Sequence, residues 1–175
     1  MLVPKTGPIS GILNVAKAGG MTSRRVVDMV QRLVRPTKAG HAGTLDPLAT
    51  GVLVVCIGQA TRLIEYVQRM PKTYEGTFLL GRTSDTEDVE GAVVELENPP
   101  QPTREAIEEA ATKFLGTIQQ RPPAYSALKV KGRRAYDLAR AGKTVDLAPR
   151  PVEIYGIEVM SYQYPELRLR IRCGS

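Results

Sequence analysis

The segment Gly51–Gly58, GVLVVCIG, constrains the fold more than any other stretch of the sequence. It is a continuous apolar run, rich in β-branched residues, with a glycine at each end. A run of this length without polar alternation is typical of a strand whose two faces are both covered. We therefore expect a central strand here, in a sheet flanked by helices.

Weaker patterns predict the elements around this strand. Further strands are expected at 11–17, 72–81, 152–160 and 167–173. Helices are expected from a cap at Thr22 or Ser23 up to Pro36, and at 61–70, 103–116 and 135–140. The acidic segment 81–91 is expected to be a loop or hairpin connection, and RPPAY at 121–125 an extended or turning segment. The sum is an α+β fold, a single domain with a largely antiparallel mixed sheet.

The helix expected at 103–116 carries the clearest amphipathic pattern. Its apolar positions recur at helical spacing, and Gly116 is expected to close it. The residues expected to face inward are Ala106, Ile107, Ala110, Ala111 and Phe114.

Composition limits the class of protein. The 175 residues are enough for one domain with its own core, and no apolar run approaches the roughly 20 residues that a membrane span requires. The N-terminus lacks the pattern of an export signal, and Cys56 and Cys173 form no paired motif. We expect a cytoplasmic monomer with two unpaired buried thiols, no metal, no cofactor and no membrane contact.

Charge is unevenly distributed along the chain. The net charge is +6, which suits a polyanionic partner. The stretch Arg121–Lys143 holds seven basic residues and one acid, whereas Asp85–Glu109 holds nine acids and one base. The basic stretch also contains Tyr125 and Tyr136, and this mixture is typical of surfaces that bind phosphates and stack on bases. A solvated surface with core tyrosines is the alternative interpretation.

Asp46 lies in TLDPLATG, directly before the central strand. The motif alone favours an Asp-Pro turn. No second acid is nearby, no glycine-rich nucleotide loop occurs, and Cys56 lies inside the apolar run rather than beside His41. What remains for chemistry is a lone carboxylate that acts as a nucleophile or stabilises charge on a substrate.

Four motifs together resemble one family. They are GHAGTLDPLATGVLVVCIGQATRL, KTYEGTFLLG, SDTEDVEG and RPPAYSALKVKGRRAYDLARAG. In this order they closely resemble the bacterial tRNA pseudouridine-55 synthases of the TruB family, and the similarity runs from Gly11 to the end of the chain. The last motif has the bacterial form rather than that of the guide-RNA-dependent archaeal and eukaryotic relatives.

The resemblance implies a pseudouridine synthase fold and the isomerisation of one uridine in the T-loop of tRNA. Asp46 matches the family's catalytic aspartate, whether it attacks the ribose or the base. Tyr74 matches the tyrosine that stacks on the target uracil and can help remove its proton. Because the target base must leave its stack, contacts with the RNA have to offset the cost of flipping.

The other implied roles concern RNA binding and support. His41 matches a histidine that fills space near the displaced nucleotides. Lys17, Thr22 and Ser23 match an N-terminal motif that supports the loop of the active site, and Asp85 and Asp88 match an acidic loop at its border. The residues implied to contact substrate or RNA are His41, Lys17, Thr44, Arg121, Tyr125, Lys129, Lys131, Arg133, Arg134 and Tyr136.

The sequence departs from the family pattern in two places. Relatives usually read DKP where this chain has Ala16-Lys17-Ala18. The family also continues into a GTYIR-like motif, whose arginine pairs with the aspartate, and often into an RNA-binding PUA domain. Neither is present, so we expect the N-terminal part of the catalytic domain, with the RNA-gripping segment at about 121–143.

This departure leaves three functions open. The first is the synthase itself. The second is a non-catalytic module that binds or folds tRNA, because the arginine motif is missing. The third, an enzyme acting on free nucleosides, fits the mixture of tyrosines and basic residues less well.

Overall fold

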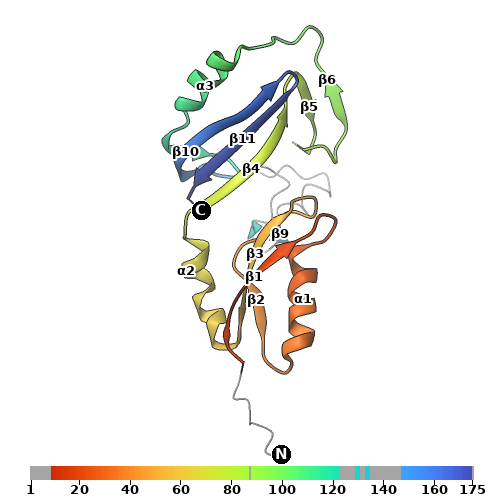
Figure 1. The fold of residues 1–175 in the computed structure, drawn as a ribbon, viewed down its shortest axis with the longest axis vertical. Helices are drawn as coiled ribbons and strands as arrows, with labels where there is room; N and C mark the ends of the chain where they lie inside the picture. The colour runs from red at the N-terminus through yellow and green to blue at the C-terminus, as the bar shows by residue number, and fades with distance from the viewer. Residues whose placement is uncertain (1–8, 87, 123–128, 131–132, 135–146, 175) are drawn as a thin grey trace, which may run out of the picture. The chain divides into compact units, whose positions relative to one another are not determined.

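The computed structural model describes residues 9–86, 88–122, 129–130, 133–134 and 147–174, with only the backbone at 129–130 and 133–134. The chain divides into two compact units, Met1–Met70 and Pro71–Ser175 (Figure 1). Each unit is described by itself below.

The first unit is a three-stranded sheet with helices on both faces (Figure 1). Its strands are β1 (Gly11–Lys17), β2 (Ala39–His41) and β3 (Gly51–Ile57), in the order β1-β3-β2 with antiparallel pairing. Its helices are α1 (Ser23–Val34), the 3₁₀ helix η1 (Gly58–Leu63) and α2 (Ile64–Gln68). The strand predicted from the apolar run is the central one.

Alternate residues of β3 build two small cores. Leu53 and Val55 pack with Val26 and Val27 of α1. On the opposite face, Cys56 packs in a cluster that includes Ala60 of η1. Complete burial of an aliphatic side chain stabilises a fold by about 1.5–3 kcal/mol, so these contacts hold the unit together. Coverage of both faces is confirmed for most of β3, but Val52 near its start is 66% exposed.

The two helical predictions in this unit had different outcomes. The expected cap of α1 is confirmed, because the Thr22 side chain accepts a hydrogen bond from the Arg25 amide. The helix expected at 61–70 is instead η1 followed by the short α2. Gly58, with φ of +61°, turns the chain directly out of β3, and Thr61 Oγ1 donates to Gly58 O at 2.7 Å, which tightens the first turn.

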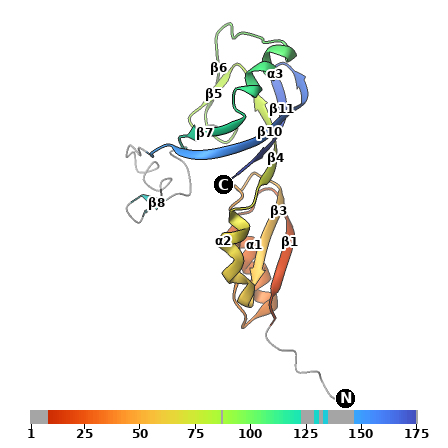
Figure 2. The ribbon, with the colours of Figure 1, turned by 90° about the vertical axis from the view of Figure 1, so that its left-hand side faces the viewer.

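The second unit is built on a four-stranded antiparallel sheet in the order β4-β11-β10-β7 (Figures 1 and 2). These strands are β4 (Lys72–Leu79), β7 (Gly116–Gln120), β10 (Arg150–Gln163) and β11 (Glu166–Cys173). Two smaller pairs are β5 (Arg82–Ser84) with β6 (Val93–Glu95), and β8 (Lys129–Val130) with β9 (Arg133–Arg134). The predicted strands at 72–81, 152–160 and 167–173 and the acidic hairpin connection are confirmed.

The two faces of this sheet differ in chemistry. On one face Tyr74 and Phe78 of β4 lie opposite Ile171 and Leu167 of β11. On the other face the partners are charged or polar, with Glu75 opposite Arg170. This alternation was predicted for β11 and follows from the two-residue period of a strand.

The helix of this unit, α3 (Arg104–Thr112), differs from its prediction. It begins after the cap Thr103 as expected but ends before Gly116, which instead opens β7 with φ of +88°. The set of residues predicted to face inward is confirmed only in part. Ile107 and Ala111 are half-buried, whereas the other three are exposed, Phe114 by 54%. The helix packs along β10, where Arg104 Nη2 donates to Val159 O at 2.7 Å, and only a narrow stripe is covered.

These elements confirm an α+β fold with antiparallel strand pairing. The pairing is divided among four separate sheets in the described residues rather than one mixed sheet. The prediction that the whole chain is one catalytic domain stays a prediction.

Candidate active site

Asp46 lies on the loop between β2 and β3, and its side chain is exposed. In the described part of the chain its carboxylate has no hydrogen-bonded or ion-paired partner, while its backbone carbonyl accepts from the Ala49 amide at 3.1 Å. An exposed carboxylate pays no desolvation cost for its charge and is open to a substrate. The Asp46 carboxylate is thus accessible to solvent, while its backbone carbonyl takes part in the turn that the motif predicts.

The residue before Asp46 is held in place twice. The Ser23 hydroxyl donates to Leu45 O at 3.0 Å and lies 2.9 Å from the Leu45 amide, from which it accepts. The Leu45 side chain packs against the core cluster of α1 and β3. The hydrogen bonds of the Leu45 backbone and the packing of its side chain thus hold in place the chain directly before Asp46.

The residue after Asp46 is held as firmly. Pro47 O accepts from the Gly20 amide at 2.8 Å and from Lys17 Nζ at 3.2 Å. The same ammonium group donates to Met21 O at 2.8 Å and to Ala18 O at 3.1 Å, and Lys17 is only 2% exposed. Three carbonyl oxygens compensate for the burial of this charge. Lys17 is directed into the loop and away from solvent.

His41 and Thr44 lie on the same connection. His41, half-buried at the end of β2, places Nδ1 2.6 Å from Gly43 O. A carbonyl oxygen only accepts, so Nδ1 is the donor in this contact. Thr44 is exposed. The structure therefore brings Asp46, Lys17, His41 and Thr44 together in the first unit.

Tyr74 lies in the second unit, on β4 opposite Ile171, and is 47% exposed. Its neighbour Glu75 is on the other face of the sheet. There Arg170 donates to Glu75 Oε1 through Nε and Nη2, at 3.0 and 2.9 Å, and Arg168 donates to Oε2 at 3.0 Å. The hydrogen bonds from Arg170 and Arg168 lower the pKa of Glu75, and the bonds to Glu75 and Glu158 raise that of Arg170.

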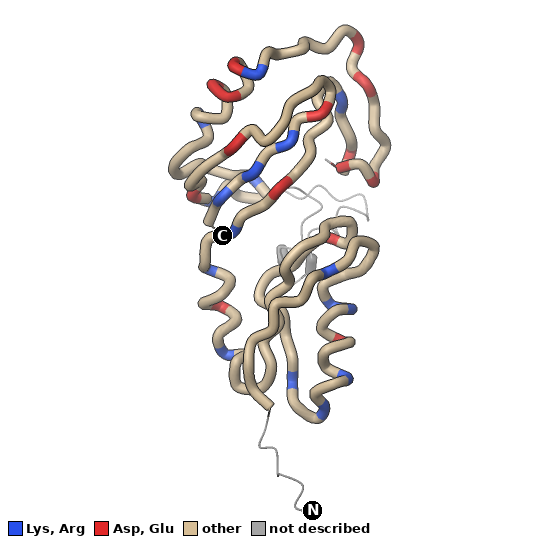
Figure 3. Tube along the Cα trace, in the orientation of Figure 1, with Lys and Arg blue, Asp and Glu red and all other residues tan. Residues whose placement is uncertain are grey.

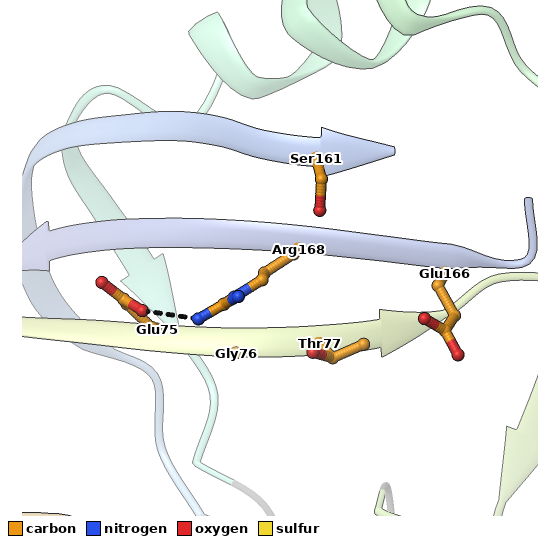
Figure 4. A pocket seen from close by; sticks show the side chains of 6 residues that line it. All are labelled: Glu75, Gly76, Thr77, Ser161, Glu166 and Arg168. Atoms are coloured by element: carbon orange, nitrogen blue, oxygen red, sulfur yellow. Dashed lines mark hydrogen bonds and ion pairs between the residues drawn. The ribbon is translucent and has the colours of Figure 1, made fainter. Parts of the chain in front are cut away.

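This charged face of the sheet carries a polar hollow. Figure 3 shows Lys and Arg positions recurring along β11, with Asp and Glu positions on the strands beside it. Figure 4 shows the hollow, of about 360 Å³, with the Glu75–Arg168 ion pair on one side. The other lining residues are Gly76, Thr77, Ser161 and Glu166.

Asp85 and Asp88 organise the connection between β5 and β6. Asp85 Oδ1 accepts from the Ala92 amide at 2.9 Å. Asp88 Oδ1 accepts from Thr86 Oγ1 at 2.5 Å and from the Glu90 amide at 2.9 Å, and these bonds lower the pKa of Asp88. At least one oxygen of each acid is thus engaged within its own loop.

A second hollow lies at the opposite end of β3 from Asp46. It has a volume of about 340 Å³, and its lining includes Lys38, Arg62, Thr37 and Thr61. Both cations are exposed and form no ion pair in the described residues. The sequence motifs did not single out Lys38 and Arg62. The signal that could have found them is the excess of basic over acidic residues in the first 70 positions.

No helix among the described residues is long and apolar enough to cross a membrane. The same residues contain no group of three or more His, Cys, Asp and Glu side chains arranged to hold a metal ion. Both cysteines are free thiols; Cys56 is buried, which raises its pKa, and Cys173 is half-buried.

Residues 31–175 match the sequence profile of the family described as TruB family pseudouridylate synthase (N terminal domain). The chain belongs to this family. Among curated proteins, it is 46% identical over 167 residues to a tRNA pseudouridine synthase B of Acaryochloris marina. The aligned residues cover 94% of this chain and 57% of that protein. The protein of the same name from Chromohalobacter salexigens is 45% identical, with 95% and 54% covered. The chain thus spans about half the length of these TruB-family relatives.

Solved structures support the fold of this TruB-family chain. A Cbf5-Nop10-Gar1 complex contains a chain that matches with a TM-score of 0.68 and 28% identity, covering 94% of this chain and 40% of that one. An H/ACA RNP bound to a substrate RNA containing 2'-deoxyuridine matches at a TM-score of 0.64 and 24% identity, which supports the fold alone.

Much of the predicted RNA-gripping segment of this TruB-family chain lies outside the described residues. This applies to Tyr125, Lys131 and Tyr136 and to the helix expected at 135–140. Arg121 is exposed, and the backbones of Lys129, Arg133 and Arg134 form the β8–β9 pair.

Proposed function

We propose that this protein isomerises uridine to pseudouridine in the T-loop of tRNA, at position 55. The observation that carries the proposal is the bare carboxylate of Asp46 on a loop anchored on both sides, in a chain of the TruB family. The relatives named tRNA pseudouridine synthase B support tRNA as the substrate.

The reaction is balanced within one nucleotide. The bond from the ribose C1′ to N1 of uracil breaks, the base turns, and a bond from C1′ to C5 forms, while C5 loses a proton and N1 gains one. Asp46 is the nucleophile, bonded transiently to the ribose or to the base. A single acid is sufficient because the reaction consumes neither water nor an oxidant.

The neighbouring residues divide the remaining tasks. Lys17 supports the loop through its three carbonyl contacts, His41 and Thr44 flank the displaced nucleotide, and Tyr74 stacks on the uracil and assists removal of the C5 proton. Aromatic stacking contributes roughly 1–3 kcal/mol per base, which is comparable to the cost of flipping. Asp85 and Asp88 shape a hairpin at the border of the site.

The T-arm is held by phosphate contacts. The residues proposed for this task are Arg121, Lys129, Lys131, Arg133 and Arg134, with Tyr125 and Tyr136 available for stacking. We add Lys38 and Arg62, two exposed cations that line one hollow with the hydroxyls of Thr37 and Thr61. We further propose that the protein acts as a monomer in the cytoplasm, where its tRNA substrate is found.

Release of tritium from tRNA labelled at C5 of uridine tests the proposal. Because the family's GTYIR-like motif supplies the arginine that pairs with the aspartate, residues 1–175 alone are expected to release little or no tritium, and a longer chain that includes this motif is expected to release it. In that longer chain Asp46→Asn is expected to abolish release while tRNA binding persists, because Asn cannot serve as the nucleophile. The matched control is Asp28→Asn, which removes an acid of the same unit that pairs with Arg24 at 2.9 Å. Full activity of Asp46→Asn would refute the assigned nucleophile.

The same assay separates the alternatives. Salt-sensitive tRNA binding without tritium release, by the longer chain that includes the arginine motif, would identify a binding or folding module. Activity on free uridine would identify a nucleoside enzyme.

A further inference from the structure

The outer face of α1 carries arginines that no carboxylate neutralises. The helix holds three arginines and one aspartate, and Figure 3 shows the basic positions recurring along it. Arg24 pairs with the aspartate, Asp28, at 2.9 Å. Arg25 and Arg32 are exposed and form no ion pair with any described residue. Since the buried residues of the helix pack on the sheet, these two arginines project to solvent.

Arg25 and Arg32 lie on one line along α1, with Met29 between them. Spacings of four and three residues place side chains on the same face of a helix. The two arginines are separated by about 10 Å along the helix axis, at 1.5 Å per residue. Each guanidinium is charged at any ordinary pH and offers several hydrogen-bond donors in one plane. Two such groups at this separation suit an extended polyanion better than a single small anion.

The two ends of α1 are tied to two places that are proposed above to contact tRNA. At its start, Ser23 donates at 3.0 Å to the backbone of the residue before Asp46. Near its end, the Gln31 side chain bonds the backbones of the two residues that flank Lys38, at 2.5 and 2.8 Å. The twelve residues of the helix span about 18 Å. The line of arginines therefore runs between the proposed nucleophile and a proposed phosphate contact.

We infer that Arg25 and Arg32 bind phosphates of the paired RNA stem that closes the target loop. The target nucleotide of the loop is placed at Asp46, so the RNA that continues along α1 is the stem. Duplex RNA is bound largely through its backbone and shape, and a phosphate occurs at every step of each strand. The inference rests on the proposed function, because it takes the T-arm of tRNA as the substrate.

A protein partner fits the outer face of α1 less well. Met29 and Leu33 are the large apolar side chains of this helix that are exposed, by 51% and 85%. A stable protein interface needs roughly 1,000 Å² of buried surface and a cluster of apolar or aromatic anchors. Two separate apolar side chains beside unpaired arginines favour a backbone of phosphates instead.

The experiment compares Arg25→Gln, Arg32→Gln and the double variant, with Arg24→Gln as the matched control. Glutamine removes the charge and keeps a similar helix propensity. The control removes an arginine from the same first turn, but one that is already paired with Asp28. Two RNAs are used, a T-arm hairpin with its full stem and the loop sequence as a single strand. Binding of each RNA is measured by filter retention over a series of salt concentrations.

Each single variant is expected to lower the slope of log K against log salt for the hairpin by about 0.7–0.9, and the double variant by about twice that. The reason is that each lost phosphate contact releases one counterion fewer on binding. The slope for the single-stranded loop should stay the same in all variants. Arg24→Gln should leave the slope for both RNAs unaltered.

An unaltered hairpin slope in the double variant overturns the inference. An equal loss in Arg24→Gln also overturns it, because the effect would then follow net charge rather than these two side chains. An equal loss for the hairpin and the single strand overturns the assignment to the stem. Absence of hairpin binding by the unaltered protein would refute the proposed tRNA substrate itself, whereas hairpin binding with an unaltered slope in the double variant leaves the proposed function standing.

Discussion

The loop around Asp46 is stabilised mainly through its neighbours. Leu45 and Pro47 carry the hydrogen bonds to Ser23, Gly20 and Lys17, while the Asp46 carboxylate remains exposed. Reactive groups work best when their backbone is fixed and their own polar atoms are left for the substrate, because no reorganisation is then needed during the reaction. Among these supports, the ammonium group of Lys17 is a buried charge with three carbonyl partners.

Lys17→Met is expected to destabilise the first unit. The substitution keeps a long apolar chain but leaves three carbonyl oxygens without their charged donor, and each such hydrogen bond contributes about 1.5–3 kcal/mol. Because the three contacts share one group, a total loss of about 2–4 kcal/mol is expected in denaturant unfolding. Arg24→Met, which removes an exposed cation of the same unit, is the control and should change stability little.

At the scale of elements, β4 places two different chemistries on its two faces. Tyr74 is on the apolar face, and Glu75, the next residue, is tied to Arg168 and Arg170 of β11 on the charged face. β11 is the sole hydrogen-bonded neighbour of β4 within the described strands, so these ion pairs add side-chain contacts to a ladder at the sheet edge. The strand that carries Tyr74 is thus held to β11 by ion pairs on the face opposite Tyr74.

Glu75→Gln is expected to lower the melting temperature of the second unit at neutral pH. The pKa of Glu75 is below its ordinary value of 4.5, so its contribution to stability is complete above that value. The contribution is lost as the pH falls through the lowered pKa, because protonation removes the ion pairs. The difference between the two proteins should therefore shrink in acid and at high salt, as followed by thermal unfolding.

Glu153→Gln is the control for this prediction, since Glu153 accepts from the hydroxyl of Thr117 instead of pairing with an arginine. A difference between Glu75→Gln and the unaltered protein that stays constant from neutral to strongly acid pH would contradict the assignment.

At the scale of the whole molecule, the net charge belongs to one unit. Residues 1–70 hold nine Lys and Arg against three Asp and Glu, whereas residues 71–175 hold fifteen of each. The charge of +6 is thus carried entirely by the unit that contains Asp46. A field of this sign favours association with a polyanion and weakens with added salt.

Arg62→Glu is expected to weaken tRNA binding and to reduce its salt dependence. Loss of one phosphate contact should lower the slope of log K against log salt by about 0.7–0.9, and Lys38→Glu with Arg62→Glu by about twice that. The measurement is tRNA binding by filter retention over a series of salt concentrations. Lys113→Glu, which makes the same charge change in the second unit at a residue 3.8 Å from Glu109, should leave the slope unaltered. Equal slopes for Arg62→Glu and the unaltered protein would rule out this contact.

The sequence by itself determined the elements whose signals are local. The apolar run of β3, the cap at Thr22 and the alternation of β11 all produced the predicted structures, because β-branched runs, capping hydroxyls and a two-residue period act over a few positions. The four motifs together likewise indicated the family, whereas the role of Asp46 stays a prediction.

Only the tertiary structure decided which side chains serve that residue and which faces are covered. Ser23 and Leu45 are 22 positions apart, and Lys17 and Pro47 are 30 apart, so no local pattern reveals that they meet. The inward face of α3 was predicted correctly only for Ile107 and Ala111 for the same reason, since the width of its contact with β10 is set by packing rather than by helical period. Burial and hydrogen bonding across distant segments are properties of the folded chain. They hold the Asp-Pro turn in place and leave the Asp46 carboxylate exposed.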